Sequence, residues 1–189
     1  MKLLLFVILL MVLSLNGMKP FVLFDGDVKK AQEYIKEKKV IKVWMFDQAL
    51  QLKDFSLAQV LIDEGKFPLN QVSTDKIHHP GWAPMHVQAH FNNAPAIEFL
   101  LRNGANINIK TNCPKLGQFH EATPLHFATE ASGLDYNALR LLVENNADLK
   151  AKDSKGRTPI VFALSRAGIN FLQQSETNVI KMILKVPIQ

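Results

Sequence analysis

The sequence predicts an all-α fold built from stacked pairs of helices, that is, a repeat solenoid. Three similar tetrapeptides recur along the chain: Ala-Pro-Met-His at 83–86, Thr-Pro-Leu-His at 123–126 and Thr-Pro-Ile-Val at 158–161. Their prolines are 40 and 35 residues apart. A second marker, two adjacent aliphatic residues followed by a turn residue, precedes each tetrapeptide. Two independent markers that recur in the same order at such a period are typical of helical repeat arrays.

Each tetrapeptide marks the expected start of a helix. Proline is tolerated in the first helical turn because its missing N–H would have no intrahelical acceptor there, and its φ is already helical. The prolines are Pro84, Pro124 and Pro159, and Thr123 and Thr158 precede two of them, where a hydroxyl can cap the helix. We therefore expect the first helix of three successive units to begin at these prolines.

The second marker indicates where the second helix of a unit ends. Apolar residues at Ile97, Leu100 and Leu101 follow the spacing i, i+3, i+4, which places them on one face of a helix. Each helix pair therefore has an apolar face that it buries only by stacking on its neighbours. A residue with positive φ is expected after these helices. The candidates are Gly65, Gly104 and Asn146.

The residues Thr-Pro-Leu-His-Phe-Ala at 123–128 resemble the signature of the ankyrin repeat, a unit of about 33 residues with a β-turn and two helices. The stretch at 151–159 also looks like the loop between two such units, and the resemblance covers roughly residues 25 to 186. It implies an all-α ankyrin-repeat solenoid with β-hairpin-like loops, non-catalytic protein binding, and structural hydrogen bonding by the tetrapeptide histidines. The motif residues to which it gives a structural role are Pro84, His86, Gly104, Thr123, Pro124, His126, Thr158 and Pro159.

The predicted organisation is a signal, a capping half-repeat and four repeats. The signal covers 1–17, the half-repeat 18–43, and the repeats about 44–82, 83–122, 123–157 and 158–186. Asp27 is the expected cap of the helix in the half-repeat. Terminal units of a stack are expected to be irregular, because each has one side in contact with water.

The N-terminal segment predicts export. Residues 3–13 are apolar without a break, follow Lys2 and precede small or polar residues. A helix of this length would rise about 16 Å, too little to cross a bilayer core of roughly 30 Å, and the layout is typical of a cleaved secretory signal. We expect an exported protein, periplasmic or secreted if the source is bacterial. Two alternatives stay open: an uncleaved membrane anchor, or a start at Met18 that would leave the protein in the cytoplasm.

Two loops between units are longer than the 33-residue period requires. The loops at 66–82 and 107–122 are extended by about six and seven residues. Insertions in solenoids map to one face, often the binding face, and neighbouring loops should project side by side. With the exposed side of the first helices they form the predicted protein-binding surface. Its residues are Phe67, His78, His79 and Trp82 in the first loop, Lys115, Phe119 and His120 in the second, and Val87, His90, Phe127 and Glu130 on the helices.

A metal-binding protein or a thiol-dependent enzyme is the alternative from a different class. His86 and His90 are four residues apart on one predicted helix face, His78 and His79 precede them, and neutral imidazoles can bind zinc or copper. Cys113 would be nucleophilic if its pKa were lowered. Because His86 has an expected structural role and no carboxylate partner is identified, we predict no catalytic residue, no metal ligand and no cofactor.

The composition and charge exclude several further classes. The single cysteine excludes an intrachain disulfide. Lys and Arg number 22 against 17 Asp and Glu, a net charge of +5, and six lysines lie between positions 28 and 42. That stretch lacks arginine and interleaved exposed aromatics, so no nucleic-acid partner is predicted. Membrane contact is expected only if the signal is uncleaved. We expect a monomer with a protein partner.

Overall fold

The computed structural model describes residues 27–74, 79–113, 119–129 and 137–162, and these residues are helical or in turns and loops. The predicted signal, the last repeat beyond Phe162, and His78, Lys115 and Glu130 lie outside the described residues. The helices are α2 (Val28–Lys36), α3 (Val43–Gln51), α4 (Phe55–Asp63), α5 (Pro84–His90), α6 (Ala94–Arg102), α7 (Pro124–Ala128) and α8 (Asn137–Glu144).

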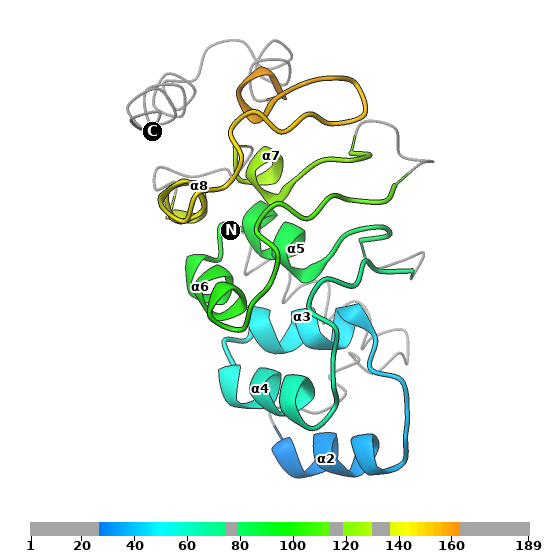
Figure 1. Cartoon of the computed structure of the whole chain (residues 1–189). Helices are drawn as coiled ribbons and strands as arrows, with labels where there is room; N and C mark the ends of the chain where they lie inside the picture. Colours follow the sequence, from blue (N-terminus) through cyan, green and yellow to red (C-terminus); the bar gives the residue numbers. More distant parts are fainter. Residues whose placement is uncertain (1–26, 75–78, 114–118, 130–136, 163–189) are drawn as a thin grey trace, which may run out of the picture.

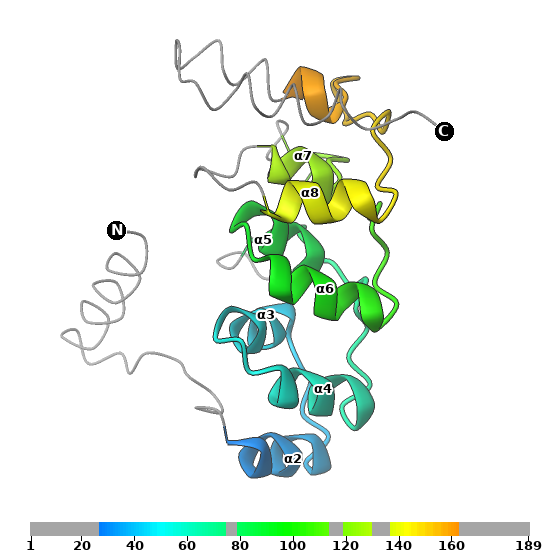
Figure 2. The same cartoon turned by 90° about the vertical axis from the view of Figure 1, so that its left-hand side faces the viewer.

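The helices form two rows that rise together along the stack. An inner row of α3, α5 and α7 carries the long loops on one side, and an outer row of α4, α6 and α8 backs it (Figure 1). The quarter-turned view shows the pairs stacked in chain order, with α2 at one end against α4 (Figure 2). The half-repeat thus contributes one helix that covers the apolar end of the first full pair.

Apolar side chains fill the space between the two rows. The predicted apolar face of this helix is confirmed, because Ile97 and Leu100 are fully buried and Leu101 is half-buried. In the outer row, the rings of Phe55 and Phe99 stack with centroids 5.2 Å apart and join α4 to α6. The largest fully buried side chains are Phe46, Leu50, Leu61, Met85, Ile97, Leu100, Leu125, Phe127, Leu139, Leu142 and Phe162. The core is therefore one continuous column rather than a set of separate centres.

The helix ends agree with most of the sequence predictions. Pro84 and Pro124 open α5 and α7, and residues 159–162 begin a further helical segment. The Asp27 carboxylate caps α2 by accepting from the N–H of Lys29 at 2.9 Å. Thr123 is the N-cap residue of α7, as expected. Its hydroxyl lies 2.9 Å from Nδ1 of His126, the third residue of that helix.

Gly65 does not have the positive φ that the sequence analysis assigned to it. The residue with that conformation is Lys66, with φ 52°, whereas Gly104 (82°) and Asn146 (62°) are as predicted. Gly65 is needed for close packing instead. A Cβ there would lie 2.6 Å from the carbonyl oxygen of Leu61, which is backbone, and 2.2 Å from Cδ1 of Ile41 in the turn after α2. Sequence alone does not separate these two uses of glycine.

Candidate protein-binding surface

The two tetrapeptide histidines join successive repeats. Nδ1 of His86 accepts from the backbone N–H of Ala83 at 3.0 Å, so its Nε2–H donates to the carbonyls of Ile109 at 2.9 Å and Ala122 at 3.1 Å. Burial lowers the pKa of His86 to about 4, because a charged imidazole would lose its hydration there. The ring is therefore neutral near pH 7 and fully used by hydrogen bonds, which leaves it unavailable as a metal ligand.

His126 repeats this arrangement one unit later. Its Nδ1 accepts from the N–H of Thr123 at 3.1 Å, and its Nε2 lies 3.0 Å from the carbonyl of Arg157. Burial lowers the pKa of His126 as well. These contacts give both histidines the structural role that the resemblance implies, and each one fixes the base of the loop that precedes the next unit.

The two long loops are closed at their bases and joined to each other. In the first, the N–H of Ser73 donates to the carbonyl of Trp82 at 2.8 Å; in the second, the N–H of Thr111 donates to the carbonyl of Ala122 at 3.0 Å. Between the loops, the N–H of Asn112 donates to the carbonyl of Gly81 at 2.8 Å. The expectation that neighbouring loops lie side by side is confirmed for their described residues, which Figure 1 shows on the same side of the stack.

Gly81 makes this close approach possible. Its φ is +78°, and a Cβ at this position would lie 2.1 Å from the carbonyl oxygen of Asn112 and 2.6 Å from Sγ of Cys113. The obstacle is backbone, which has no rotamer to change. Only glycine therefore allows the first long loop to lie against the second.

Trp82 is the centre of an aromatic cluster between the loops and the inner helices. Its ring lies 4.4 Å from that of Phe127 and 5.8 Å from that of Phe119. It also stacks on His79 at 4.9 Å and meets His90 edge-on at 5.5 Å. Trp82 itself is 7% exposed. It therefore supports a group of rings around it rather than presenting its own surface to a partner.

Four residues of the predicted binding surface are buried, which corrects their assignment. Phe67 is 4% and Trp82 is 7% exposed, while Val87 and Phe127 are fully buried. Phe67 stacks on Phe46 of α3 with centroids 4.4 Å apart. Phe67 and Trp82 therefore pack onto the stack at the ends of the first long loop, while Val87 of α5 and Phe127 of α7 lie in the helical core.

The remaining described candidates are half-buried, and the structure adds one that sequence reasoning missed. His79, His90, Phe119 and His120 keep part of their surface exposed. Phe91, the residue that ends α5, is 46% exposed, and its ring lies 5.9 Å from that of His79 and 5.2 Å from that of His90. We call His79, His90, Phe91 and Phe119 the aromatic patch. The available signal was a phenylalanine seven residues after Pro84, the proline expected to open the helix.

A buried polar cluster links the first two inner helices below this patch. The amide of Gln88 on α5 donates to the Asp47 carboxyl on α3 at 3.3 Å, and Asn93 donates to Gln88 Oε1 at 2.9 Å. Asn93 also lies 3.2 Å from the carbonyl of Leu50. Burial raises the pKa of Asp47 to about 7, against the effect of the Gln88 hydrogen bond. Its members are spread over positions 47 to 93, and no local sequence pattern marks them as a group.

The environment of Cys113 does not favour thiol chemistry. The side chain is 4% exposed, its Sγ lies 3.0 Å from the carbonyl of Pro80, and burial raises the pKa of the thiol. A reactive cysteine needs the opposite shift and access to solvent. Within the described ranges, no three His, Cys, Asp or Glu side chains converge on a possible metal position. The helices of these ranges are also too short or too polar to cross a bilayer.

Comparison with known proteins agrees with this geometry. The family model of the ankyrin repeat matches residues 80–112 and 120–154, which contain the pairs α5–α6 and α7–α8. The "Ankyrin repeat, SAM and basic leucine zipper domain-containing protein 1" of Colobus guereza is 31% identical over 121 residues, 62% of this chain. The protein of that name from Mus musculus is equally similar, and that of Pongo abelii is 30% identical.

The stacked pairs and their histidine contacts define a repeat protein of the solenoid class. The chain carries ankyrin repeats and folds as an all-α ankyrin-repeat solenoid. It spans 22% of the length of the relatives named above. Ankyrin repeats indicate a protein partner, and they are typically binding modules without catalysis.

Proposed function

We propose that this protein is a non-catalytic module that binds a protein partner through the aromatic patch. The single observation that carries the proposal is the arrangement of half-exposed rings around Trp82, which is itself buried. Rings held by a packed neighbour lose little conformational freedom on binding, and aromatic side chains are frequent anchors in protein interfaces. The patch replaces the set expected from sequence, because several of those side chains lie in the core.

Hydrogen bonds between the loops hold this surface in place. Ser154 donates its N–H to the carbonyl of His120 at 3.0 Å, which continues the row that Asn112 and Gly81 begin. A partner would therefore meet a preformed surface and would not have to order the loop bases on binding. His120 lies in this row and accepts from the N–H of Cys113 at 3.2 Å, so it positions the second loop beside the patch.

The test is affinity capture from a lysate of the source organism with matched variants. The double variant Phe91→Ala, Phe119→Ala should lose the proteins that the natural chain retains, with a melting temperature within a few degrees of the natural value. Arg102→Ala, an exposed change on the outer row, serves as the control and should retain them. Equal capture by all three proteins would contradict the proposal. Sedimentation of the same samples checks the further expectation of a monomer.

We also propose export, on the basis of the apolar run at 3–13 behind Lys2. Expression of the full chain in a bacterium, followed by N-terminal sequencing of the exported fraction, tests it. Processing near residue 17 would support a cleaved signal. A chain that keeps Met1 and sediments with membranes would indicate an anchor, and unprocessed protein in the cytoplasm would contradict export.

A further inference from the structure

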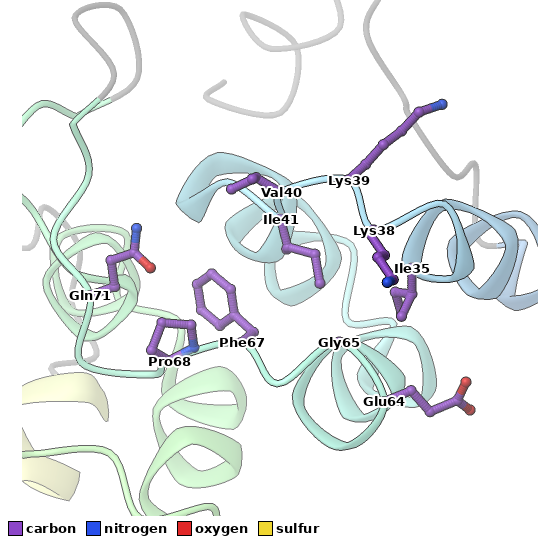
Figure 3. Close-up of a pocket in the computed structure, with 10 residues that line it drawn as sticks. All are labelled: Ile35, Lys38, Lys39, Val40, Ile41, Glu64, Gly65, Phe67, Pro68 and Gln71. Atoms are coloured by element: carbon purple, nitrogen blue, oxygen red, sulfur yellow. The ribbon is translucent and has the colours of Figure 1, made fainter.

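A concave site separate from the aromatic patch lies at the N-terminal end of the stack. It is a cavity of about 390 Å³ between the end of α2, the turn after it, and the first residues of the long loop at 66–82 (Figure 3). Figure 3 shows Ile41 and Phe67 directed into the space between these segments, whereas Lys39 and Glu64 extend outward. This volume suits one or two side chains of a bound peptide.

The lining of this pocket is partly polar and partly apolar, and its apolar part is held in place by the fold. Phe67 is packed against Phe46 and is 4% exposed, and its N–H donates to the carbonyl of Leu61 at 3.1 Å. On the other side, the hydroxyl of Tyr34 donates to the carbonyl of Val40 at 3.3 Å and fixes the turn. Val40 is 75% exposed and lies at the rim. An incoming apolar side chain would therefore find a preformed wall and cover Val40.

The charged side chains around the pocket differ in whether they already have a partner within the protein. Lys39 is paired with Glu37, and the Glu64 carboxylate accepts from Nε2 of Gln32 at 2.7 Å. Lys38 also lines the pocket and forms no ion pair with any residue that the structure describes. Over residues 27–42 the chain carries six lysines against three acidic residues. The local field therefore attracts negative charge, and Lys38 is the cation positioned to receive it.

We propose that this pocket docks an acidic peptide, with one apolar side chain seated between Ile41 and Phe67 and a neighbouring Asp or Glu paired with Lys38. This interaction is separate from the aromatic patch and does not depend on it. A peptide fits better than other anions. Phosphate recognition favours the planar fork of arginine, which is absent from 27–42, and a membrane surface has no single side chain for a cavity of this shape.

Charge reversal at Lys38 provides a sharp test. A random heptapeptide library is displayed and selected on the full chain, on Lys38→Glu and on Lys53→Glu. Lys53 is the matched control, because it is exposed, has a φ of 59° against 53° for Lys38, and lies outside the pocket. We expect the natural chain and Lys53→Glu to enrich peptides with an apolar residue next to Asp or Glu. The variant Lys38→Glu should instead enrich basic neighbours.

A synthetic peptide from the enriched set then separates pocket binding from general attraction. Its Kd, measured by fluorescence polarisation, should rise at least tenfold in Lys38→Glu and in Gln71→Trp, which fills the pocket mouth without changing charge. It should change less than twofold in Lys53→Glu and in Phe91→Ala, which reports on the aromatic patch. No enriched motif, or equal affinity for Lys38→Glu, overturns the proposal. Binding to phosphatidylserine vesicles that is lost in Lys38→Glu, without peptide binding, would assign the pocket to membranes instead.

Discussion

The side chain of Asn92 accepts a hydrogen bond from the backbone N–H of Ala138 at 2.8 Å, across 46 residues of chain. Asn92 ends the α5–α6 turn with a φ of 54°, and Ala138 is the second residue of α8. The N-terminus of α8 is thus capped from the preceding repeat. Asn93, beside it, reaches the opposite way to the carbonyl of Leu50 in the repeat before. Two adjacent amides therefore join three units on the side of the helical turns.

Replacing Asn92 by glycine should lower the free energy of unfolding by about 1 kcal/mol, because the buried N–H of Ala138 loses its acceptor. Glycine keeps the positive φ, so the change removes the side chain without adding backbone strain. Asn92→Asp keeps both the acceptor and a tolerated backbone conformation and should remain close to the natural value. Urea unfolding measures both. Equal losses for the two variants would show that the Asn92 amide matters through its donor or its packing.

Gly81→Ala should destabilise the stack more than Gly104→Ala does. Both glycines have a positive φ, so both variants incur backbone strain of about 1 kcal/mol or more. Only at Gly81 would the new Cβ meet backbone, at 2.1 Å from the Asn112 oxygen, whereas the corresponding space at Gly104 is open. Thermal unfolding should therefore give the lower melting temperature for Gly81→Ala. The same melting temperature for both variants would mean that the loop contact contributes nothing.

Phe67→Ala should cost about 3 kcal/mol of stability, the usual range for a buried phenylalanine. Phe91→Ala should cost less than about 1 kcal/mol, because Phe91 is largely outside the core. The comparison by urea unfolding distinguishes a core role from a surface role for two aromatic residues near the same loop. A small loss for Phe67→Ala would show that its ring contributes little to the core.

The pH dependence of stability should contain two opposing contributions. The pKa of His86 in the folded protein, about 4, lies below the ordinary value of 6.5. The contribution of neutral His86 to the free energy of unfolding is therefore complete above pH 6.5 and is lost as the pH falls towards 4. The folded pKa of Asp47, about 7, lies above the ordinary 3.8, so its contribution is complete below pH 3.8 and is lost as the pH rises towards 7.

The variant Asp47→Asn separates these contributions. It keeps an oxygen acceptor for Gln88 and has no proton to lose, so it should be more stable than the natural chain at pH 8 by at least about 1 kcal/mol. At pH 4 the two proteins should unfold at similar urea concentrations. A variant that is less stable than the natural chain at pH 8 would contradict the raised pKa of the buried Asp47 carboxyl.

Local signals in the sequence predicted the helical framework. Pro84 and Pro124 open helices, Asp27 caps one, and Gly104 ends another, because each of these outcomes depends on a residue and its immediate neighbours. The histidine at position 86 was assigned correctly from the resemblance. Its two carbonyl partners lie 23 and 36 residues away and could not be read from the tetrapeptide alone.

The binding surface was predicted less well, because it depends on how distant segments meet. Phe67 and Trp82 lie at the two ends of the first long loop, and nothing local indicates that these ends pack onto α3 and α7. Gly81 has no sequence pattern that distinguishes it from an ordinary turn glycine. Phe91 was missed because its exposure depends on the position of His79, twelve residues earlier. Burial is a property of the assembled stack rather than of a residue type.

The row of backbone hydrogen bonds through Gly81, Asn112, His120 and Ser154 has a mechanical consequence. When a partner pulls on one loop, these hydrogen bonds transmit part of the force to the neighbouring loops. No single helix pair then bears the whole force. Stretched in an optical trap by its loops, the protein should yield at a higher force than when it is stretched by its ends, where one pair after another can peel away. The row of hydrogen bonds therefore resists shear between neighbouring loops.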